Sequence, residues 1–520
     1  MKTKIFTLFI CLLTYSGLFS QGKGPYSINH STEFEDPDDM FLFRTTPYAD
    51  GNILLTFINS ERFDKIGLQL FSPDLKQVKV ATPDLKSMFP NKKSYFDGVK
   101  IMDKKSYLYV REVYKDTKTE GMSAVEFSPT TLELIGTPIK LFQSTRGIKN
   151  SNFGYSTALS GDRTKLFYKY DLFDKEKGSP GNQEYGFYMF DDNMKQIWGG
   201  EYELPSKMSP RDYDISNDGK LYYLMQVYGD PAKQFALLVY DKDKKDPKVI
   251  DIPTENHDFK TTYLSSDKSG NLVIAGFYSK KDNPYIDGAY VLRLDPKSGK
   301  FTNLGGGYYE IPGDIIKSYT SDREKRKLEK KEDKTEGDES KDLGIANLKI
   351  RSLNFMDDGS VAIVSEVFSI ITTTHTSGTS STSYTDVFAD EIFVFNFDPA
   401  GKLAYIKKIP KRQRGAGEAK DISISSTVKN NHVHIFYSDN PANFSLNENE
   451  PPKTFRDETN GIITCVDIDE KGEVKKYNLG EMNQFEANIH LRDFSSGRKN
   501  NMIAVEKKKK KNVLFSIDIK

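Results

Sequence analysis

The amino-acid sequence predicts an all-β fold, a β-propeller of four-stranded antiparallel blades. Three observations support this prediction: a strand-and-turn motif that recurs along the chain, a hairpin motif before each copy of it, and many residues that favour strands. The 520 residues include 29 Tyr and 34 Phe, and aromatic side chains are enriched in strands. A chain of this length exceeds what one simple core organises, so internal repetition is expected.

Residues 1–20 have the pattern of a secretory signal peptide. Lys2 and Lys4 precede an apolar run at residues 5–13, and a more polar stretch leads to Ser20. The run is shorter than the roughly 20 residues that span a bilayer, which disfavours a retained anchor. Cys11 follows Ile10, where lipidation would want a small residue. We therefore expect residues 21–520 to form one exported β-propeller domain that is periplasmic, associated with the cell surface or secreted.

The first repeated motif is an apolar run that ends in a large residue, followed by Ser or Asp and a turn. Its seven copies lie at residues 70–73, 126–129, 189–192, 239–242, 293–296, 396–399 and 467–470. Each copy leads into another short strand, such as residues 77–80 or 248–251. Each copy therefore contributes two strands to a unit.

The second motif is a hairpin upstream of each copy, and residues 214–225, "DISNDGKLYYLM", are its clearest example. The other hairpins turn at residues 49–52, 102–105, 161–164, 267–270, 356–359 and 428–431. Asp, Asn and Gly suit these positions because they tolerate the left-handed backbone of tight turns. Four strands in a row, repeated about every 50 to 60 residues, predict propeller blades. A continuous sandwich is the alternative, but it does not require the same four strands in every unit.

The two ends of the chain are predicted to complete the last blade together. After the seventh copy, residues 488–491, 502–505 and 513–517 supply three strands, and a fourth is missing. Residues 26–31 precede the first complete unit, which begins near Met40, and can supply it. We therefore predict eight blades, the last closed by the amino-terminal strand. Seven blades, with one terminal unit outside the ring, is the alternative.

The hairpin at residues 214–225 resembles the short repeat of TolB-type and WD40-like propellers, in which Ser, a polar residue, Asp-Gly-Lys and an apolar-aromatic strand follow in order. The matching residues are Ser216, Asp218, Gly219, Lys220, Leu221 and Tyr223. Residues 356–361 match in part, with Met in place of Ser and Ser in place of Lys. The resemblance implies the fold. Its members range from envelope scaffolds to peptidase-associated propellers, so it implies no single activity.

Three insertions interrupt consecutive units in the second half of the chain. In residues 321–343, "SDREKRKLEKKEDKTEGDESKDL", Leu328 is the only apolar residue before Leu343, so this segment cannot bury a strand face. Its first half favours helix and its second half disorder, and a solvated loop is favoured over a partner-binding arm. Residues 372–385 are rich in Ser and Thr and predict a flexible hairpin tip. Residues 439–456 form the third insertion, and such departures from a regular scaffold tend to carry function.

The charge and cysteine content exclude several classes of function. Lys and Arg number 74, as do Asp and Glu. The chain therefore lacks the excess of basic residues that binding to nucleic acid or to an anionic membrane requires. Without the signal peptide Cys465 is the one thiol, and no intramolecular disulfide can form. No later apolar run reaches about 18 residues, so no transmembrane segment is expected after cleavage.

His432 and His434 are the candidate metal ligands. They flank Val433 in a predicted strand and point to one face about 6.6 Å apart. A metal needs a third ligand and none is identifiable, so packing or surface histidines are favoured and no metal or other cofactor is predicted. Residues 467–472 resemble a calcium loop, but Lys471 takes the fifth position and Asn478 the twelfth, where a Glu belongs.

The sequence offers no set of catalytic residues. Residues 265–272 approach the Asp-box turn of sialidase-type propellers with the Gly one residue late, and the chain has six His and no Gly-x-Ser-x-Gly motif. We therefore predict an exported, non-enzymatic protein-interaction scaffold of the bacterial envelope or extracellular space, with a protein partner. The alternative is a glycan-binding or glycan-cleaving propeller, which would need paired carboxylates and aromatic side chains at one mouth of the central channel.

Overall fold

The computed structural model describes residues 24–520 except 38, 60–64, 90–92, 118, 145–154, 173–183, 230–233, 243–245, 256, 268, 281–282, 296–297, 303–306, 322–324, 331–343, 378–379, 418–421, 448–449, 457–460, 486–488 and 498–500. Within these residues the fold is all-β, with eight sheets built on four antiparallel strands each. The predicted fold class is confirmed. The predicted signal peptide, residues 1–20, and most of the charged insertion lie outside the described residues.

Four sheets in the first half of the chain each contain four consecutive strands. They are β2 (Met40–Pro47), β3 (Ile53–Asn59), β4 (Ile66–Phe71) and β5 (Gln77–Ala81); β6 (Lys93–Ile101), β7 (Ser106–Tyr114), β8 (Thr119–Phe127) and β9 (Leu134–Gln143); β10 (Tyr155–Leu159), β11 (Lys165–Leu172), β12 (Glu184–Asp191) and β13 (Gln196–Glu203); β14 (Met208–Ile215), β15 (Leu221–Val227), β16 (Phe235–Tyr240) and β17 (Lys248–Asp251).

The other four sheets include extra strands and the two chain ends. They are β18 (Asp258–Ser266), β19 (Leu272–Ser279), β20 (Gly288–Asp295) and β21 (Lys300–Phe301), with β22 (Tyr308–Glu310); β23 (Leu348–Phe355), β24 (Val361–Ser377), β25 (Ser380–Phe397) and β26 (Leu403–Ile409), with β27 (Gln413–Ala416) and β30 (Phe455–Arg456); β28 (Ile424–Lys429), β29 (His432–Asp439), β31 (Ile462–Ile468) and β32 (Val474–Glu481); β33 (Ser495–Ser496), β34 (Asn501–Lys508), β35 (Lys511–Ile519) and β1 (Tyr26–His30).

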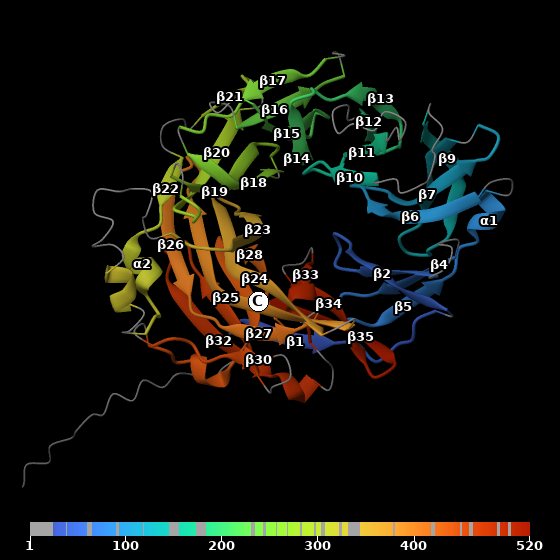
Figure 1. Cartoon of the computed structure of the whole chain (residues 1–520). Helices are drawn as coiled ribbons and strands as arrows, with labels where there is room; N and C mark the ends of the chain where they lie inside the picture. Colours follow the sequence, from blue (N-terminus) through green and yellow to red (C-terminus); the bar gives the residue numbers. More distant parts are fainter. Residues whose placement is uncertain are drawn as a thin grey trace, which may run out of the picture.

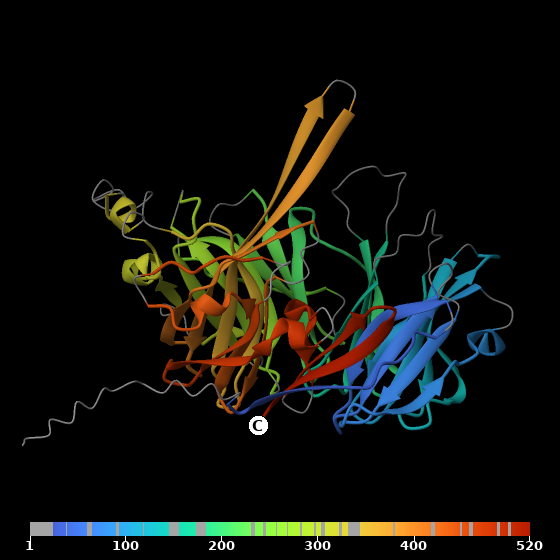
Figure 2. The same ribbon diagram turned by 90° about the horizontal axis from the view of Figure 1, so that it is seen from below.

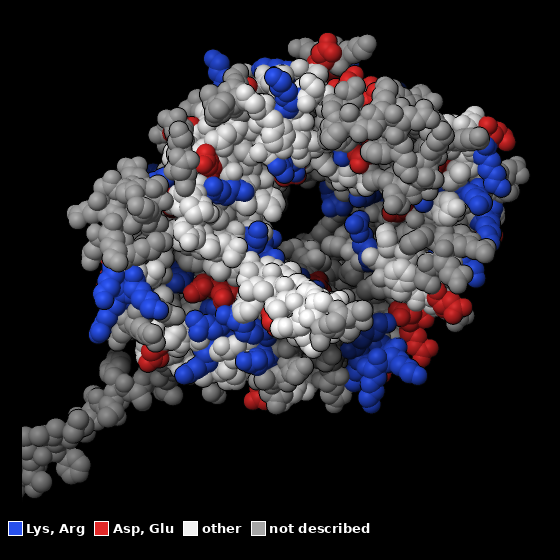
Figure 3. All heavy atoms as spheres, viewed as in Figure 1, with Lys and Arg blue, Asp and Glu red and all other residues white. Residues whose placement is uncertain are grey.

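The sheets stand side by side around a central opening, and the strands nearest to it are β2, β6, β10, β14, β18, β23, β28 and β33 (Figure 1). Side chains do not fill the opening, which stays visible when all atoms are drawn (Figure 3). Short helices lie in the connections: α1 (Leu85–Met88), α2 (Gly313–Lys317), residues 325–330, and the 3-10 turns η3 (Pro441–Asn443), η4 (Met482–Phe485) and η5 (Leu491–Asp493). None of the helices in the described part of the chain has the length and apolar character that crossing a bilayer would require.

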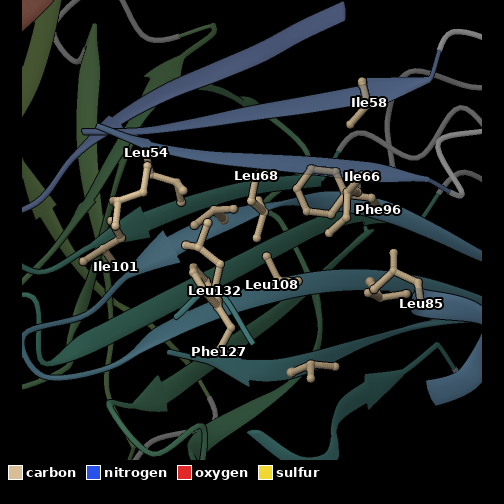
Figure 4. Close-up of a cluster of buried hydrophobic side chains, with 14 of the residues drawn as sticks. Leu54, Ile58, Ile66, Leu68, Leu85, Phe96, Ile101, Leu108, Phe127 and Leu132 are labelled. Carbon is tan, nitrogen blue, oxygen red and sulfur yellow. The ribbon is translucent and has the colours of Figure 1, made fainter. Parts of the chain in front are cut away.

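The core consists of apolar clusters between neighbouring sheets. In one of them, Leu54 and Leu68 of the first sheet pack against Leu108 and Phe127 of the second (Figure 4). Strands such as β3 and β4 consist mostly of apolar residues because neighbouring sheets cover both faces of each sheet. Each fully buried Leu or Phe contributes about 1.5–3 kcal/mol, so the stability of the fold accumulates around the ring.

The two ends of the chain meet in one sheet. Residues Tyr26 to His30 pair with Ile519 to Phe515, antiparallel, and the Ser31 N–H donates to the Leu514 carbonyl over 2.9 Å. Ile503 and Leu514 of this sheet pack against Leu55 and Phe57 of the sheet that begins at Met40. The amino-terminal segment therefore joins the last sheet, which itself lies against the first.

One predicted strand is absent. Residues 488–491 were expected to form a strand of the last sheet, but residues 489–490 are not in a strand, Leu491 begins the 3-10 turn η5, and the fourth strand of this sheet is the two-residue β33. The reason is local: the backbone N–H of His490 donates to Oε1 of Glu506 over 2.8 Å, and its Nδ1 lies 2.6 Å from Oε2. A backbone N–H held by a side chain cannot join a strand ladder.

The chemistry of the hairpin turn explains why residues 214–225 have the sequence they do. Ser216 Oγ hydrogen-bonds Asp218 and accepts the N–H of Lys220 over 3.0 Å, while Gly219 adopts φ +86°. Ser160 and Asp162 repeat the arrangement at 2.6 Å. The side chains thus hold both turns from inside, and the left-handed position is taken by Gly219 in the first turn and by Arg163, at φ +60°, in the second.

Candidate functional site

A long hairpin projects from the ring. Strands β24 and β25 pair from Val361 with Phe397 out to Ser377 with Ser380. Strand β23 pairs with β24 only as far as Val367, and β27 pairs with β25 only from Asp386 to Ala389. The two strands therefore extend beyond their neighbours as a separate ribbon, residues 368–385, which we call the arm (Figure 2). The insertion at residues 372–385 was expected to be a flexible tip, but outside residues 378–379 it consists of paired strands. Thr favours this because its branched side chain suits a strand.

The surface of the arm is uncharged and partly apolar. No Asp, Glu, Lys or Arg occurs between Phe368 and Thr385. Ile370, Ile371 and Tyr384 are 59%, 51% and 60% exposed. Figure 3 shows the arm as a white surface beside the opening, with Lys and Arg side chains on both sides of it. Clustered exposed apolar side chains of this kind mark interaction sites.

Two extra strands, one of them from the third insertion, lie at the base of the arm. Strand β27 pairs with β25 at Asp386 to Ala389, and β30, from the third insertion, pairs in parallel with β27. Val387, Ala389, Ile422 and Phe455 form a small core there. The extra strands thus anchor the base of the arm to the ring.

A buried ion pair lies at this base. Glu366 Oε1 and Lys411 Nζ are 2.6 Å apart, and neither side chain is exposed to solvent. Arg351 also contacts Glu366, at 2.6 Å, and the hydroxyl of Ser423 donates to it over 2.7 Å. Burial tends to raise the pKa of Glu366, but Lys411 and Arg351 overcome this effect and hold the pKa below its usual value.

Lys411 also ties three elements together. Its Nζ donates to the Ala389 carbonyl of β25 over 2.8 Å and to the Gln413 side chain of β27 over 3.0 Å. Gln413 in turn donates to the Ser438 carbonyl of β29 over 2.6 Å. We call Arg351, Glu366, Lys411, Gln413 and Ser423 the arm root. The arm root fixes the point from which the arm leaves the ring, because every one of its polar contacts bridges different strands or loops.

Cationic side chains also cover the aromatic residues where the arm begins. The guanidinium carbon of Arg351 lies 4.2 Å from the ring centre of Phe368, and that of Arg414 lies 4.7 Å from the ring centre of Phe388. Arg414 is held by an ion pair with Asp390. These contacts shield the two aromatic rings and leave the arm beyond them uncovered.

Asp439 and Asn443 organise the third insertion. The Asn443 side chain donates to Asp439 Oδ1 over 2.7 Å and to the Lys453 carbonyl over 2.8 Å, and it accepts the Lys453 N–H. Burial raises the pKa of Asp439 to about 6. A single buried Asn thus closes this loop, and the loop delivers β30 to the arm base.

The first insertion borders a groove lined with lysines. The groove, with a volume of about 900 Å³, lies between α2, residues 325–330, β26 and the turn before β32. Lys317, Lys325, Lys407, Lys471 and Lys476 line it, together with the acidic residues Asp314, Glu329 and Glu473. The helix-favouring half of the insertion is thus helical at residues 325–330. Residues 331–343 lie outside the described part of the chain.

Several of the predicted hairpin turns line one cavity. The cavity, of about 600 Å³, is lined by Ala49, Gly161, Ser266, Asp357, Asn430 and Gly497, which come from six sheets. Side chains link the turns around the ring: Asn431 Oδ1 accepts the N–H of Asp357 over 3.0 Å, and Asn217 Oδ1 accepts that of Asp162 over 3.2 Å.

The carboxylates of β14 join two sheets. Asp212 Oδ2 accepts the N–H of Leu264 in β18 over 2.9 Å, and Asp214 Oδ2 accepts the hydroxyl of Ser266 over 2.8 Å. Their Oδ1 atoms accept the N–H groups of Tyr213 and Ile215. Burial raises the pKa of both carboxyl groups, although these hydrogen bonds oppose the shift. Because all four oxygens are engaged by the protein, a role in holding sheets together is favoured over glycan cleavage.

The structure places His432 and His434 on one face, as expected, with ring centres 6.1 Å apart. His432 Nδ1 contacts Asp467 Oδ1 at 2.8 Å, whereas His434 Nδ1 lies 2.8 Å from the hydroxyl of Tyr26 in β1. In the described residues, no group of three or more His, Cys, Asp or Glu is arranged to hold a metal. The two histidines therefore contact neighbouring strands: His432 contacts β31, and His434 contacts the amino-terminal strand β1.

Residues 467–472 form a tight turn. Asp469 Oδ1 accepts the N–H groups of Lys471 and Glu473 over 2.9 and 2.8 Å. The carboxylate therefore serves the turn itself, as Asp267 does in its own hairpin.

Sequence reasoning missed the arm root. One signal was present: Glu366 is the only charged residue in the run 361–371, "VAIVSEVFSII", and a charge inside a buried strand needs a partner. Its partner, Lys411, is 45 positions away, in a segment whose strand β27 follows no repeated motif. The pairing is therefore visible only once the strands are in place.

No family model matches the chain, and no curated protein matches it. Solved structures resemble it at low identity. The WD40 domain of SCAP from fission yeast is 8% identical over 95% of this chain and 98% of that chain, with a TM-score of 0.37. The β-propeller domain of the Trilobed protease from Pyrococcus furiosus is 12% identical over 85% and 96%, with a TM-score of 0.34. The polysaccharide lyase Uly1 is 10% identical over 82% and 90%, with a TM-score of 0.37.

Proposed function

We propose that this protein is an exported, non-enzymatic β-propeller that serves as a protein-interaction scaffold in the bacterial envelope or outside the cell. Export rests on the pattern of residues 1–20, which are described by sequence alone. The scaffold role rests on one observation, the arm: an uncharged ribbon with exposed Ile370, Ile371 and Tyr384 that leaves a regular ring at a fixed point. The arm is the element that contacts the partner.

Affinity capture from envelope extracts of the native host tests this proposal. The bait is the full chain, compared with a variant in which residues 372–385 are replaced by Asn-Gly, a pair that closes a two-residue hairpin after Ile371 and before Asp386. The intact protein should retain a partner that the shortened variant loses.

A second variant separates the ribbon from its side chains. In Ile371→Ser with Tyr384→Ser the backbone of the arm is kept and its apolar surface is reduced, so partner recovery should fall while the melting temperature stays unchanged. Equal recovery of the same partner by all three proteins would show that the arm is not the contact element.

A further inference from the structure

The outer part of the arm has two open strand edges. From Ser369 to its end at Ser377 the edge of β24 pairs with no strand in the described chain, because β23 ends its pairing at Val367 and the Phe368 N–H donates to the Asn347 carbonyl. The edge of β25 is likewise unpaired from Ser381 to Tyr384 within the described residues. A two-stranded ribbon with both edges open is marginally stable in water, so such a ribbon favours a third strand.

The arm lacks the features by which this protein protects its other edges. The outermost strands of the regular sheets carry charged residues, such as Lys79 in β5, Lys140 in β9, Lys248 in β17 and Lys475 in β32. Charges, prolines and bulges at an edge prevent pairing with another chain. Residues 369–376 contain no charge and no proline, and the bulge of β24 lies earlier, between Glu366 and Phe368.

We propose that the β24 edge of the arm pairs, antiparallel, with the same edge of a second copy of this chain. This inference rests on the proposed function and names the partner that the arm takes. A second copy of the chain is favoured as the partner because the edge carries no charge that would attract a charged protein. Two identical uncharged edges also bring no like charges together. The arm also projects away from the ring, so two rings can stay apart while their arms lie side by side (Figure 2).

The twofold symmetry of such a pair fixes which residues meet. In an antiparallel pair of identical strands the residue on the axis faces its own copy, and for a segment from Ser369 to Ser377 that residue is Thr373. Thr372 then faces Thr374 of the second copy. Both threonines are exposed, so they can be changed without disturbing the core.

Complementary charges give the sharpest test. One variant carries Thr372→Lys with Thr374→Lys and another Thr372→Glu with Thr374→Glu, and all species are studied by analytical ultracentrifugation. The wild-type protein should show twice the monomer mass at high concentration. Each charged variant alone should sediment as a monomer, because four like charges meet, and an equal mixture of the two should recover the doubled mass.

A cysteine at the axis gives an independent readout. Cys465 is buried, so Thr373→Cys introduces an accessible thiol into the mature chain. Under mild oxidation this variant should form a disulfide-linked dimer, whereas the matched control Ser383→Cys, on the neighbouring strand, should remain largely monomeric. A wild-type protein that stays monomeric up to its solubility limit, or charged variants whose mixture does not associate, would overturn the inference.

The outcomes separate this inference from the proposed function. If the purified protein is monomeric while the arm still captures another host protein, the inference is wrong and the scaffold role stands. If the arms pair but the intact protein captures no other protein from the host, the inference stands and the scaffold role is wrong.

Discussion

At the scale of single residues, polar side chains carry the contacts between neighbouring sheets. Asp212, Asp214 and Asn431 each accept a backbone N–H from a neighbouring sheet. The hydroxyl of Tyr26 in β1 lies 2.8 Å from Nδ1 of His434 in β29, which belongs to the adjacent sheet. A backbone N–H has a fixed position, so such bonds set the spacing of sheets more strictly than apolar packing does. The residues that sequence reasoning treats as turn formers thus also align the ring.

His434 gives a prediction about pH. Burial lowers its pKa to about 4, below the value of about 6.5 expected in an unfolded chain. The folded state therefore keeps His434 neutral between these values while the unfolded state takes up a proton, so stability present above pH 6.5 is lost as the pH falls towards 4. In His434→Asn, which keeps an acceptor for Tyr26, the loss of unfolding free energy over this range should be smaller by up to about 3 kcal/mol.

Urea denaturation at a series of pH values measures this effect. His375→Asn removes an exposed histidine of the arm and is the matched control; its pH dependence should follow that of the wild type. A slope in His434→Asn equal to that of the wild type would show that this histidine is not the source.

At the scale of elements, the turns were predictable and the insertions were not. The hairpins at residues 214–225 and 161–164 follow from Ser and Asp at a fixed spacing of two residues, because the interactions are local. The structures of the arm and of the segment before β33 depend on contacts that no turn motif marks: Thr372 pairs with Thr385, and the backbone N–H of His490 donates to Glu506. Residues 372–385 were expected to be a flexible hairpin tip because they are rich in Ser and Thr, and their pairing as two strands was not predicted.

The arm root gives the prediction for this scale. Removing one partner of a buried ion pair leaves the other charge without compensation, at a cost of about 3–5 kcal/mol. Lys411→Met and Glu366→Gln should each lower the free energy of unfolding by about this amount. The double variant should lose clearly less than the sum of the two, because the charges disappear together.

Guanidinium denaturation of the three variants measures the coupling. Thr374→Ala, on the exposed part of the arm, is the control and should change stability by less than about 0.5 kcal/mol. Additive losses would mean that Glu366 and Lys411 act separately, with Arg351 alone neutralising the carboxylate.

At the scale of the whole molecule, the repeat predicted the fold because one four-strand pattern can bury both faces of every sheet only if the sheets stand side by side. The missing strand after Ile519 pointed to residues 26–31, and β1 lies there. The candidate site was less accessible to sequence reasoning. The asymmetry of the insertions was visible, but the Glu366–Lys411 contact at the base of the arm was not.

The amino-terminal strand gives the last prediction. Deleting residues 21–33 removes five paired positions along β35, the buried ring of Tyr26 with its contact to His434, and the hydrogen bonds of Ser31 with Leu514. Hydrogen bonds worth about 1 kcal/mol each and one buried aromatic ring amount to a large part of the roughly 5–15 kcal/mol that stabilises a domain. The melting temperature should therefore fall sharply, and the exposed edge of β35 should promote aggregation. Tyr26→Ala, which keeps the strand and loses the ring, should lie between the deletion and the wild type. Calorimetry distinguishes the three proteins, and an unchanged melting curve for the deletion would show that the ring does not depend on the meeting of its ends.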